Sequence, residues 1–153
     1  MITDKYLTSV AAFVINSAGV DEVFPYFNEL KEEVKLPALY FPNPMVTSSS
    51  GTLDSFELEY TLFVKIIANT DELAYEIASN IQRAIMNNRR KVPVYEKDNS
   101  ETGYYLRVKP SEIKKVETHT YQLTLSWTEY SRYEDTNDTG DIFSKVEFDI
   151  QSK

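Results

Sequence analysis

The clearest pattern along the chain is an alternation of apolar and other side chains over residues 55–68. The apolar positions recur at every second residue: Phe56, Leu58, Tyr60, Leu62, Val64 and Ile66. A period of two places successive side chains on opposite faces of a strand. The intervening positions are polar at first, with Glu57 and Glu59, and apolar later, with Phe63 and Ile67. The pattern predicts a long strand, solvated on one face at one end and buried on both faces at the other.

A second alternation predicts another long strand over residues 116–130. One side of it is mainly apolar and consists of His119, Tyr121, Leu123, Leu125 and Trp127. Its β-branched and aromatic content favours a strand. Short strands are predicted at 92–96 and 104–108. Another is predicted at 39–41, where Pro37 and Pro42 on either side favour an edge position.

Two helices are predicted from apolar residues at helical spacing. Residues 70–88 carry an i, i+4 stripe of Leu73, Ile77, Ile81 and Ile85, preceded by a capping-box-like Asn69-Thr70-Asp71-Glu72. Residues 4–17 form a second amphipathic segment, with Thr3 as N-cap and Gly19 as a stop. Residues 20–53 are otherwise irregular, and the polar run 47–51 is expected to be a mobile loop. The order of elements predicts an α+β fold, a mostly antiparallel sheet with two main helices on one face.

The last twenty residues are set apart from this pattern. Residues 134–141 carry four acidic and no basic side chains, and residues 142–150 then alternate as a further strand. We therefore expect one domain over residues 1–133 and an extension over 134–153. The extra strand could pair within its own chain or with the sheet edge of a neighbouring subunit. If it pairs between subunits, removing 134–153 weakens the oligomer but leaves a folded domain.

Charge and composition exclude several classes of function. The net charge is −8 and the isoelectric point is about 4.7, which argues against nucleic-acid binding and against anionic membranes. The chain has no cysteine, so disulfides and thiolate metal sites are excluded. It has no apolar stretch near the roughly 20 residues of a membrane span. No leader is evident at the N-terminus, so the protein is expected to stay where it is made.

Candidate catalytic and cofactor-binding chemistry is sparse. The single histidine, His119, lies on the apolar side of a predicted strand without a framing nucleophile and acid, which favours packing over catalysis. Residues 135–140 resemble the start of a calcium loop, but Val146 stands where the twelfth position needs glutamate. Neither glycine-rich phosphate motif occurs. We expect no enzyme activity, cofactor or metal.

Candidate contacts with a neighbouring subunit come from charge and from the tail. The basic run Arg89, Arg90 and Lys91 follows the second helix, where it complements the helix dipole. It could also meet an acidic patch on a neighbour, and the acidic loop offers one. The predicted interface residues are Arg89, Arg90, Lys91, Asp135, Asp138, Val146, Phe148 and Ile150.

The order of elements resembles the tail terminator proteins, or tail completion and neck proteins, of tailed bacteriophages and phage-tail-like particles. The resemblance covers residues 2–133 and is closest where a strand leads directly into an amphipathic helix, over residues 59–74, EYTLFVKIIANTDELA. It implies a structural protein of the virion tail or neck, assembled in the bacterial cytoplasm. Such proteins form a ring, typically a hexamer, that caps the tail tube and meets the head connector protein.

The resemblance also implies a ring lumen through which DNA passes without specific binding. An acidic lining would let DNA slide, and Glu57 and Glu59 at the solvated strand end are candidate lining residues. The alternative, from the charge alone, is a small acidic monomer that binds one basic protein, as immunity and inhibitor proteins do.

Overall fold

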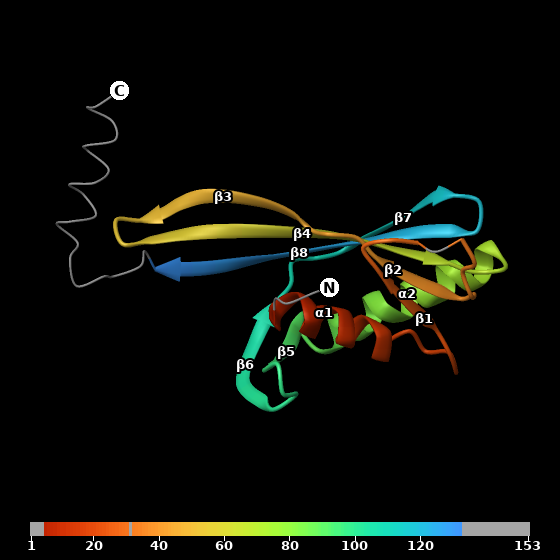
Figure 1. Ribbon diagram of the computed structural model, residues 1–153, viewed down its shortest axis with the longest axis horizontal. Helices are drawn as coiled ribbons and strands as arrows, with labels where there is room; N and C mark the ends of the chain where they lie inside the picture. The colour runs from red at the N-terminus through yellow and green to blue at the C-terminus, as the bar shows by residue number, and fades with distance from the viewer. Residues whose placement is uncertain (1–4, 31, 133–153) are drawn as a thin grey trace, which may run out of the picture.

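The structure is a computed structural model that describes residues 5–30 and 32–132. Two helices and eight strands occur in these residues: α1 (Lys5–Asn16), β1 (Phe24–Phe27), β2 (Ala38–Phe41), β3 (Met45–Thr52), β4 (Ser55–Ile67), α2 (Asp71–Asn87), β5 (Lys91–Tyr95), β6 (Glu101–Arg107), β7 (Glu112–Glu117) and β8 (Thr120–Arg132). Both helices lie on one side of the main sheet (Figure 1). Every described strand pair is antiparallel except β1–β2. The predicted α+β class is therefore confirmed.

The main sheet is built around the pair β4–β8. Their register runs without a shift from Ser55 opposite Arg132 to Ile67 opposite Thr120. Two strands follow one another along the other edge of β4: β2 pairs with Lys65–Ile67, and β3 pairs with Ser55–Thr61. At about 3.3 Å per residue, the thirteen-residue strands β4 and β8 extend roughly 40 Å. The seventeen-residue helix α2 extends only about 25 Å at 1.5 Å per residue, so the sheet is much longer than the helices that cover it.

The core lies between the sheet and the two helices. On the sheet side it consists of alternate residues of β4 and β8, all fully buried: Leu62, Val64, Ile66, Leu123, Leu125 and Trp127. On the helix side α2 contributes Ile77, Ile81 and Ile85 of the predicted stripe. Thr70 is the N-cap of this helix, and its hydroxyl accepts a hydrogen bond from the Leu73 N–H at 3.1 Å.

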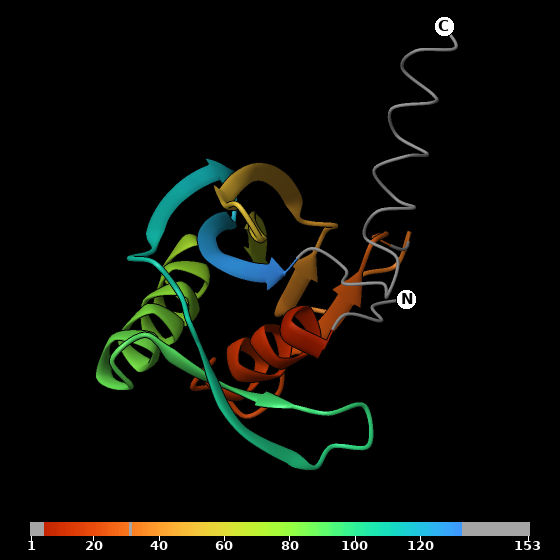
Figure 2. The same ribbon diagram turned by 90° about the vertical axis from the view of Figure 1, so that its left-hand side faces the viewer.

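A second, two-stranded sheet of β5 and β6 lies on the far side of α1 from the main sheet (Figure 2). Its attachment to α1 includes a half-buried hydrogen bond, 3.0 Å long, from the Tyr95 N–H to Ser9 Oγ. An exposed ion pair between Lys5 and Glu96 spans 3.3 Å beside it. The hairpin also contributes Val92, Val94 and Leu106 to the core.

Two expectations for residues 20–53 are wrong. The run 47–51 is not a loop but part of β3, because the Ser55–Thr61 edge of β4 is left open by β2 and supplies a ladder of backbone hydrogen bonds. Strand β2 is not an edge strand, since β1 pairs with it in parallel on the other side. Pro37 and Pro42 lie just outside β2, so all four of its residues keep their N–H groups.

The start of the second long strand also differs from the prediction. His119 has a φ of 61° and lies in the turn between β7 and β8, not on the apolar face of a strand. The alternating residues before it belong to β7, which the sequence pattern did not separate from β8. The buried face of β8 through Leu123, Leu125 and Trp127 is as predicted.

Candidate functional site

The most unusual feature is the end of the main sheet that extends beyond the helices (Figure 1). We call this part the arm. It comprises β3, the 55–61 part of β4 and the 126–132 part of β8. All eight residues of β3 are exposed. Neither helix covers the outer part of the arm, beyond Tyr60 and Trp127, so both faces of that part are open in the described residues.

The core-side face of the arm continues the apolar stripe of β4 away from the core. Trp127 is buried at its base and stacks on Tyr60, with ring centroids 5.5 Å apart. Beyond them Leu58 is only half-buried, and its directly opposed neighbours are the polar Ser48 and Glu129. The stripe therefore continues from the core onto a surface that has apolar side chains but, among the described residues, no covering layer.

The opposite face of the arm is polar and acidic. Glu57 and Glu59 lie there, as predicted, and are directly opposed to Tyr130 and Thr128 of β8. Glu59 forms an ion pair with Lys109, which leaves less net negative charge at that position. Tyr130 is 70% exposed although its ring is large and apolar. Tyrosine is enriched at protein interfaces for its apolar body and polar tip.

Both strand edges of the arm lack a partner in the described residues, since β3 is paired with β4 alone and the outer part of β8 is open too. Strand β7 pairs with β8 only up to Thr124, and an isolated bridge from Val108 reaches Trp127. From Thr128 onward β8 is paired on its β4 side alone. Unpaired backbone N–H and C=O groups along an edge can add a further strand.

The basic run after α2 is not one uniform patch. Arg89 and Arg90 both adopt left-handed backbone conformations, with φ of 57° and 61°. The Arg90 guanidinium donates a hydrogen bond to the Val108 carbonyl at 3.2 Å, so it ties the turn to the segment before β7. Lys91 lies over the Tyr105 ring at 5.9 Å. Arg89 and Lys91 are exposed and remain candidates for contacts with a neighbour.

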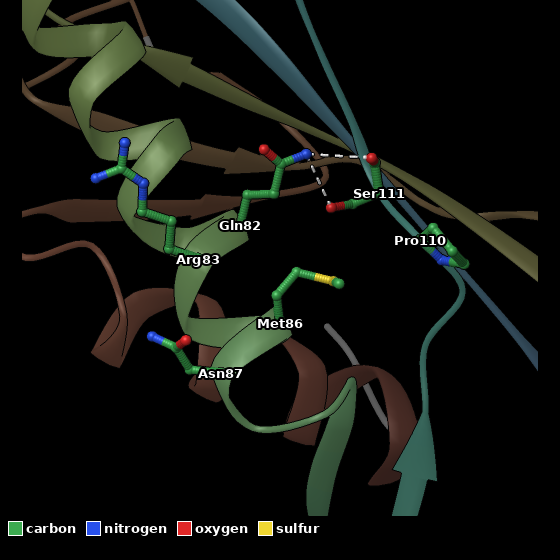
Figure 3. A pocket seen from close by; sticks show the side chains of 6 residues that line it. All are labelled: Gln82, Arg83, Met86, Asn87, Pro110 and Ser111. Carbon is green, nitrogen blue, oxygen red and sulfur yellow. Dashed lines mark hydrogen bonds between the residues drawn. The ribbon is translucent and has the colours of Figure 1, made fainter.

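A shallow hollow of about 400 Å³ lies beside this basic end, between the C-terminal half of α2 and the segment before β7 (Figure 3). It is lined by Gln82, Arg83, Met86, Asn87, Pro110 and Ser111. Gln82 Nε2 donates to the Ser111 carbonyl at 3.1 Å and closes one end. Met86 points toward Pro110 across the hollow, and Arg83 points outward. Sequence reasoning missed it because 109–111 was not assigned to any element.

An electrostatic cluster fixes the N-terminus of α2 to the β7–β8 turn. The Asp71 carboxylate accepts hydrogen bonds from Lys115 Nζ at 2.7 Å and from the His119 N–H at 2.6 Å. The bond from Lys115 is the main cause that lowers the pKa of Asp71, and the bond to Asp71 raises the pKa of Lys115. His119 Nδ1 is 3.4 Å from the same carboxylate. This cluster holds the turn in place, and both the backbone and the side chain of His119 take part in it.

Other candidate chemistry is weak in the part of the chain that the structure describes. No group of three or more His, Asp or Glu side chains is placed there to hold a metal ion. No helix in residues 5–30 and 32–132 is long and apolar enough to cross a membrane. The tail residues Asp135, Asp138, Val146, Phe148 and Ile150 lie outside the described residues, so their predicted role in an interface stays a prediction.

The sequence of the chain is similar to that of a protein from a phage-like element. It is 27% identical over 108 residues to the phage-like element PBSX protein XkdJ of Bacillus subtilis strain 168, covering 71% of this chain and 73% of that protein. It is 26% identical over 108 residues to the uncharacterised protein YqbJ of the same strain, covering 71% and 72%. No family model matches.

Among solved structures, a chain in the virion of a native gene transfer agent particle has a TM-score of 0.47 and 10% sequence identity. The match covers 83% of this chain and 94% of that one. The sequence similarity of the chain to a protein of a phage-like element rests on XkdJ.

Proposed function

We propose that this chain is a structural protein of a phage or phage-tail-like particle, and that it forms a ring, typically a hexamer, at the end of the tail tube. The ring stops growth of the tube protein and offers a surface to the head connector protein. The observation that carries the proposal is the arm, whose outer part extends beyond both helices and has no covering layer in the described residues. Similarity to a protein of a phage-like element supports the particle as its place of action.

An arm of this kind is better suited to an assembly than to a lone chain. Three strands gain stability when a hydrophobic face is packed against something, and the outer half of this arm has no such layer in the described residues. An open strand edge with apolar neighbours is also a hazard for uncontrolled association. A defined neighbour that covers the arm would remove both problems. Self-assembly is therefore the function that the fold supports best.

The charge of the arm suits a passage for DNA. Glu57 and Glu59 lie together on the face turned away from the helices, so they are proposed to line the ring lumen. Since Glu59 is paired with Lys109, Glu57 is the stronger candidate. With a net charge of −8, the chain would repel phosphate groups, so DNA could pass without binding.

The direct test is a tube-capping assay. Purified chain is added to polymerising tail tube protein of the same particle, and tube length is measured by electron microscopy. We expect short tubes with a ring at one end. Tyr130→Ser in the arm should reduce capping, whereas Tyr104→Ser on β6 should not; the two side chains are similarly exposed, at 70% and 73%. Tubes of unchanged length and without rings would overturn the proposal.

An acidic monomeric binding module is the competing function, and the net charge of −8 is what favours it. Such a protein would neutralise one basic partner as a monomer. A neighbouring toxin gene, together with tight one-to-one binding of its product, would support this reading. Neighbouring tube and connector genes would support the ring.

A further inference from the structure

The tip of the arm is a tight turn that presents one apolar side chain to solvent. Thr52 and Ser55 are directly paired, so only Leu53 and Asp54 form the connection between β3 and β4. The Thr52 hydroxyl donates to Asp54 Oδ1 at 2.8 Å and lies 2.7 Å from Ser55 Oγ. These bonds preorganise the turn. Leu53 is nonetheless fully exposed, at 102% of its reference area.

The hollow beside α2 has the complementary character. Met86, which is 52% exposed, and Pro110 provide apolar walls, and Arg83 also lines the hollow, with its guanidinium directed away from Met86 and Pro110 (Figure 3). Its volume of about 400 Å³ accommodates a leucine side chain. It is open to solvent, and four of its six lining residues are polar, but Gln82 and Ser111 are hydrogen-bonded to each other. An apolar side chain can therefore pack against Met86 and Pro110.

The charges of the two regions are also opposite. The arm segment 45–61 contains three acidic residues, Asp54, Glu57 and Glu59, and no basic residue. Residues 77–95, which include the C-terminal half of α2, contain four basic residues and no acidic one. Opposite potentials favour encounter and fix the orientation of docking.

A single chain cannot bring its own tip to its own hollow. Glu112 follows the hollow residue Ser111 and is paired with Thr124 of β8. Thr124 is in turn paired with Phe63 of β4, so the hollow lies near Phe63 along the sheet. The tip lies beyond Ser55, at the other end of the same uninterrupted strand. At about 3.3 Å per residue, Ser55 and Phe63 are roughly 25 Å apart. The two regions can therefore meet only between copies.

We infer that the arm tip of one copy docks into the hollow of the next copy, with Leu53 between Met86 and Pro110 and with Asp54 facing Arg83. This inference rests on the proposed ring and names its contact. Because tip and hollow are different patches, the contact is heterologous. Repeated from copy to copy, it closes into a ring when the rotation allows. Regions of one sequence thus supply both halves of the interface.

The chain has no cysteine, so a pair of introduced cysteines reports the contact directly. Leu53→Cys and Met86→Cys are made separately, mixed in equal amounts with tube protein present, and oxidised. A disulfide requires Cβ atoms roughly 4 Å apart, so only close docking gives a product. We expect a covalent dimer in the mixture, and a ladder up to the ring size when both substitutions are in one chain.

The matched control replaces Met86→Cys with Tyr75→Cys, an exposed position on the same helix about three turns away (roughly 16 Å). Leu53→Cys should give little product with it. If the control pair links as well as the test pair, or if Leu53→Cys links to itself, the inference is overturned. If light scattering shows a ring but the test pair does not link, the inference fails and the proposed ring stands. If no ring forms even on tubes, both fail.

A charge exchange gives an independent readout. Asp54→Lys and Arg83→Glu should each weaken assembly severalfold, since each places like charges together. Combining them restores opposite charges and should recover most of the loss. Additive losses in the combined variant would show that Asp54 and Arg83 do not face each other and would overturn the inference. Leu53→Asp should weaken assembly by roughly tenfold or more because a buried leucine contact is lost.

Discussion

Two leucines on the same face of β4 should respond very differently to the same truncation. Leu62 is fully buried under the helices and is directly opposed to Leu125 of β8. Leu58 lies four residues earlier, on the arm, where it is half-buried between Ser48 and Glu129. Replacing each with alanine removes the same atoms from the same strand. The difference between them measures how far the core extends into the arm.

The magnitudes follow from burial. Leu62→Ala should cost about 2–5 kcal/mol, as truncations in closed cores do, because the lost transfer free energy is joined by a cavity. Leu58→Ala should cost about 1 kcal/mol or less, because much of the side chain is already in water and no closed cavity forms. For a chain of this size, Leu62→Ala is then expected to lower Tm by roughly 10 °C. Leu58→Ala should lower it by a few degrees at most.

The assay is urea denaturation of the wild type and both variants at a concentration where light scattering shows monomer. Wild-type and variant m-values should agree, so that midpoints report stability. An equal loss of stability in the two variants would refute the reasoning, since it would mean that the arm is packed within a single chain. In assembled rings the difference between the stability losses of the two variants should be smaller, because docking covers the arm.

Three further predictions concern local features. Asp71→Asn should make stability less sensitive to acid. The lowered pKa of Asp71 gives stability that is present above about pH 4 and is lost as pH falls through the folded-state pKa. The urea midpoints at pH 3 and pH 6 should therefore differ less in the variant than in the wild type. Thr70→Ala removes the N-cap of α2 and should cost about 1 kcal/mol, read from the same denaturation curves. Arg89→Gly should leave the fold intact or stabilise it by up to about 1 kcal/mol, because glycine accepts the φ of 57° without strain.

Much of the fold could be predicted because the core elements carry strong periodicity. The apolar stripe of α2 and the alternation in β4 and β8 arise because one face of each element is buried. Burial of one face leaves a periodic apolar pattern that can be read from the sequence. Strand β3 could not be predicted, because its fully exposed residues have no buried face to leave a pattern. It forms because the edge of β4 needs hydrogen bonds, which is a property of the tertiary arrangement. The turn at His119 was missed for a similar reason, since Asp71 lies 48 residues away and holds its backbone.

The candidate surfaces were predicted only in part. The sequence indicated an acidic strand end at Glu57 and Glu59 and a basic run after α2, and the structure places both at the surface. It gave no sign that Glu59 pairs with Lys109, fifty residues away, or that the Arg90 guanidinium binds a carbonyl. The arm itself follows from the difference in length between strands and helices, which only the assembled sheet reveals.

The central claim, assembly of this chain with copies of itself, is tested most directly by its mass in solution. Light scattering of the full chain at high micromolar concentration should give a discrete particle of about six times the 17.7 kDa chain mass, and in a mixture with tube protein the chain should be found in the tube-sized particles. A mass of 17.7 kDa for the chain alone, together with no chain in the tube-sized particles, would contradict the account.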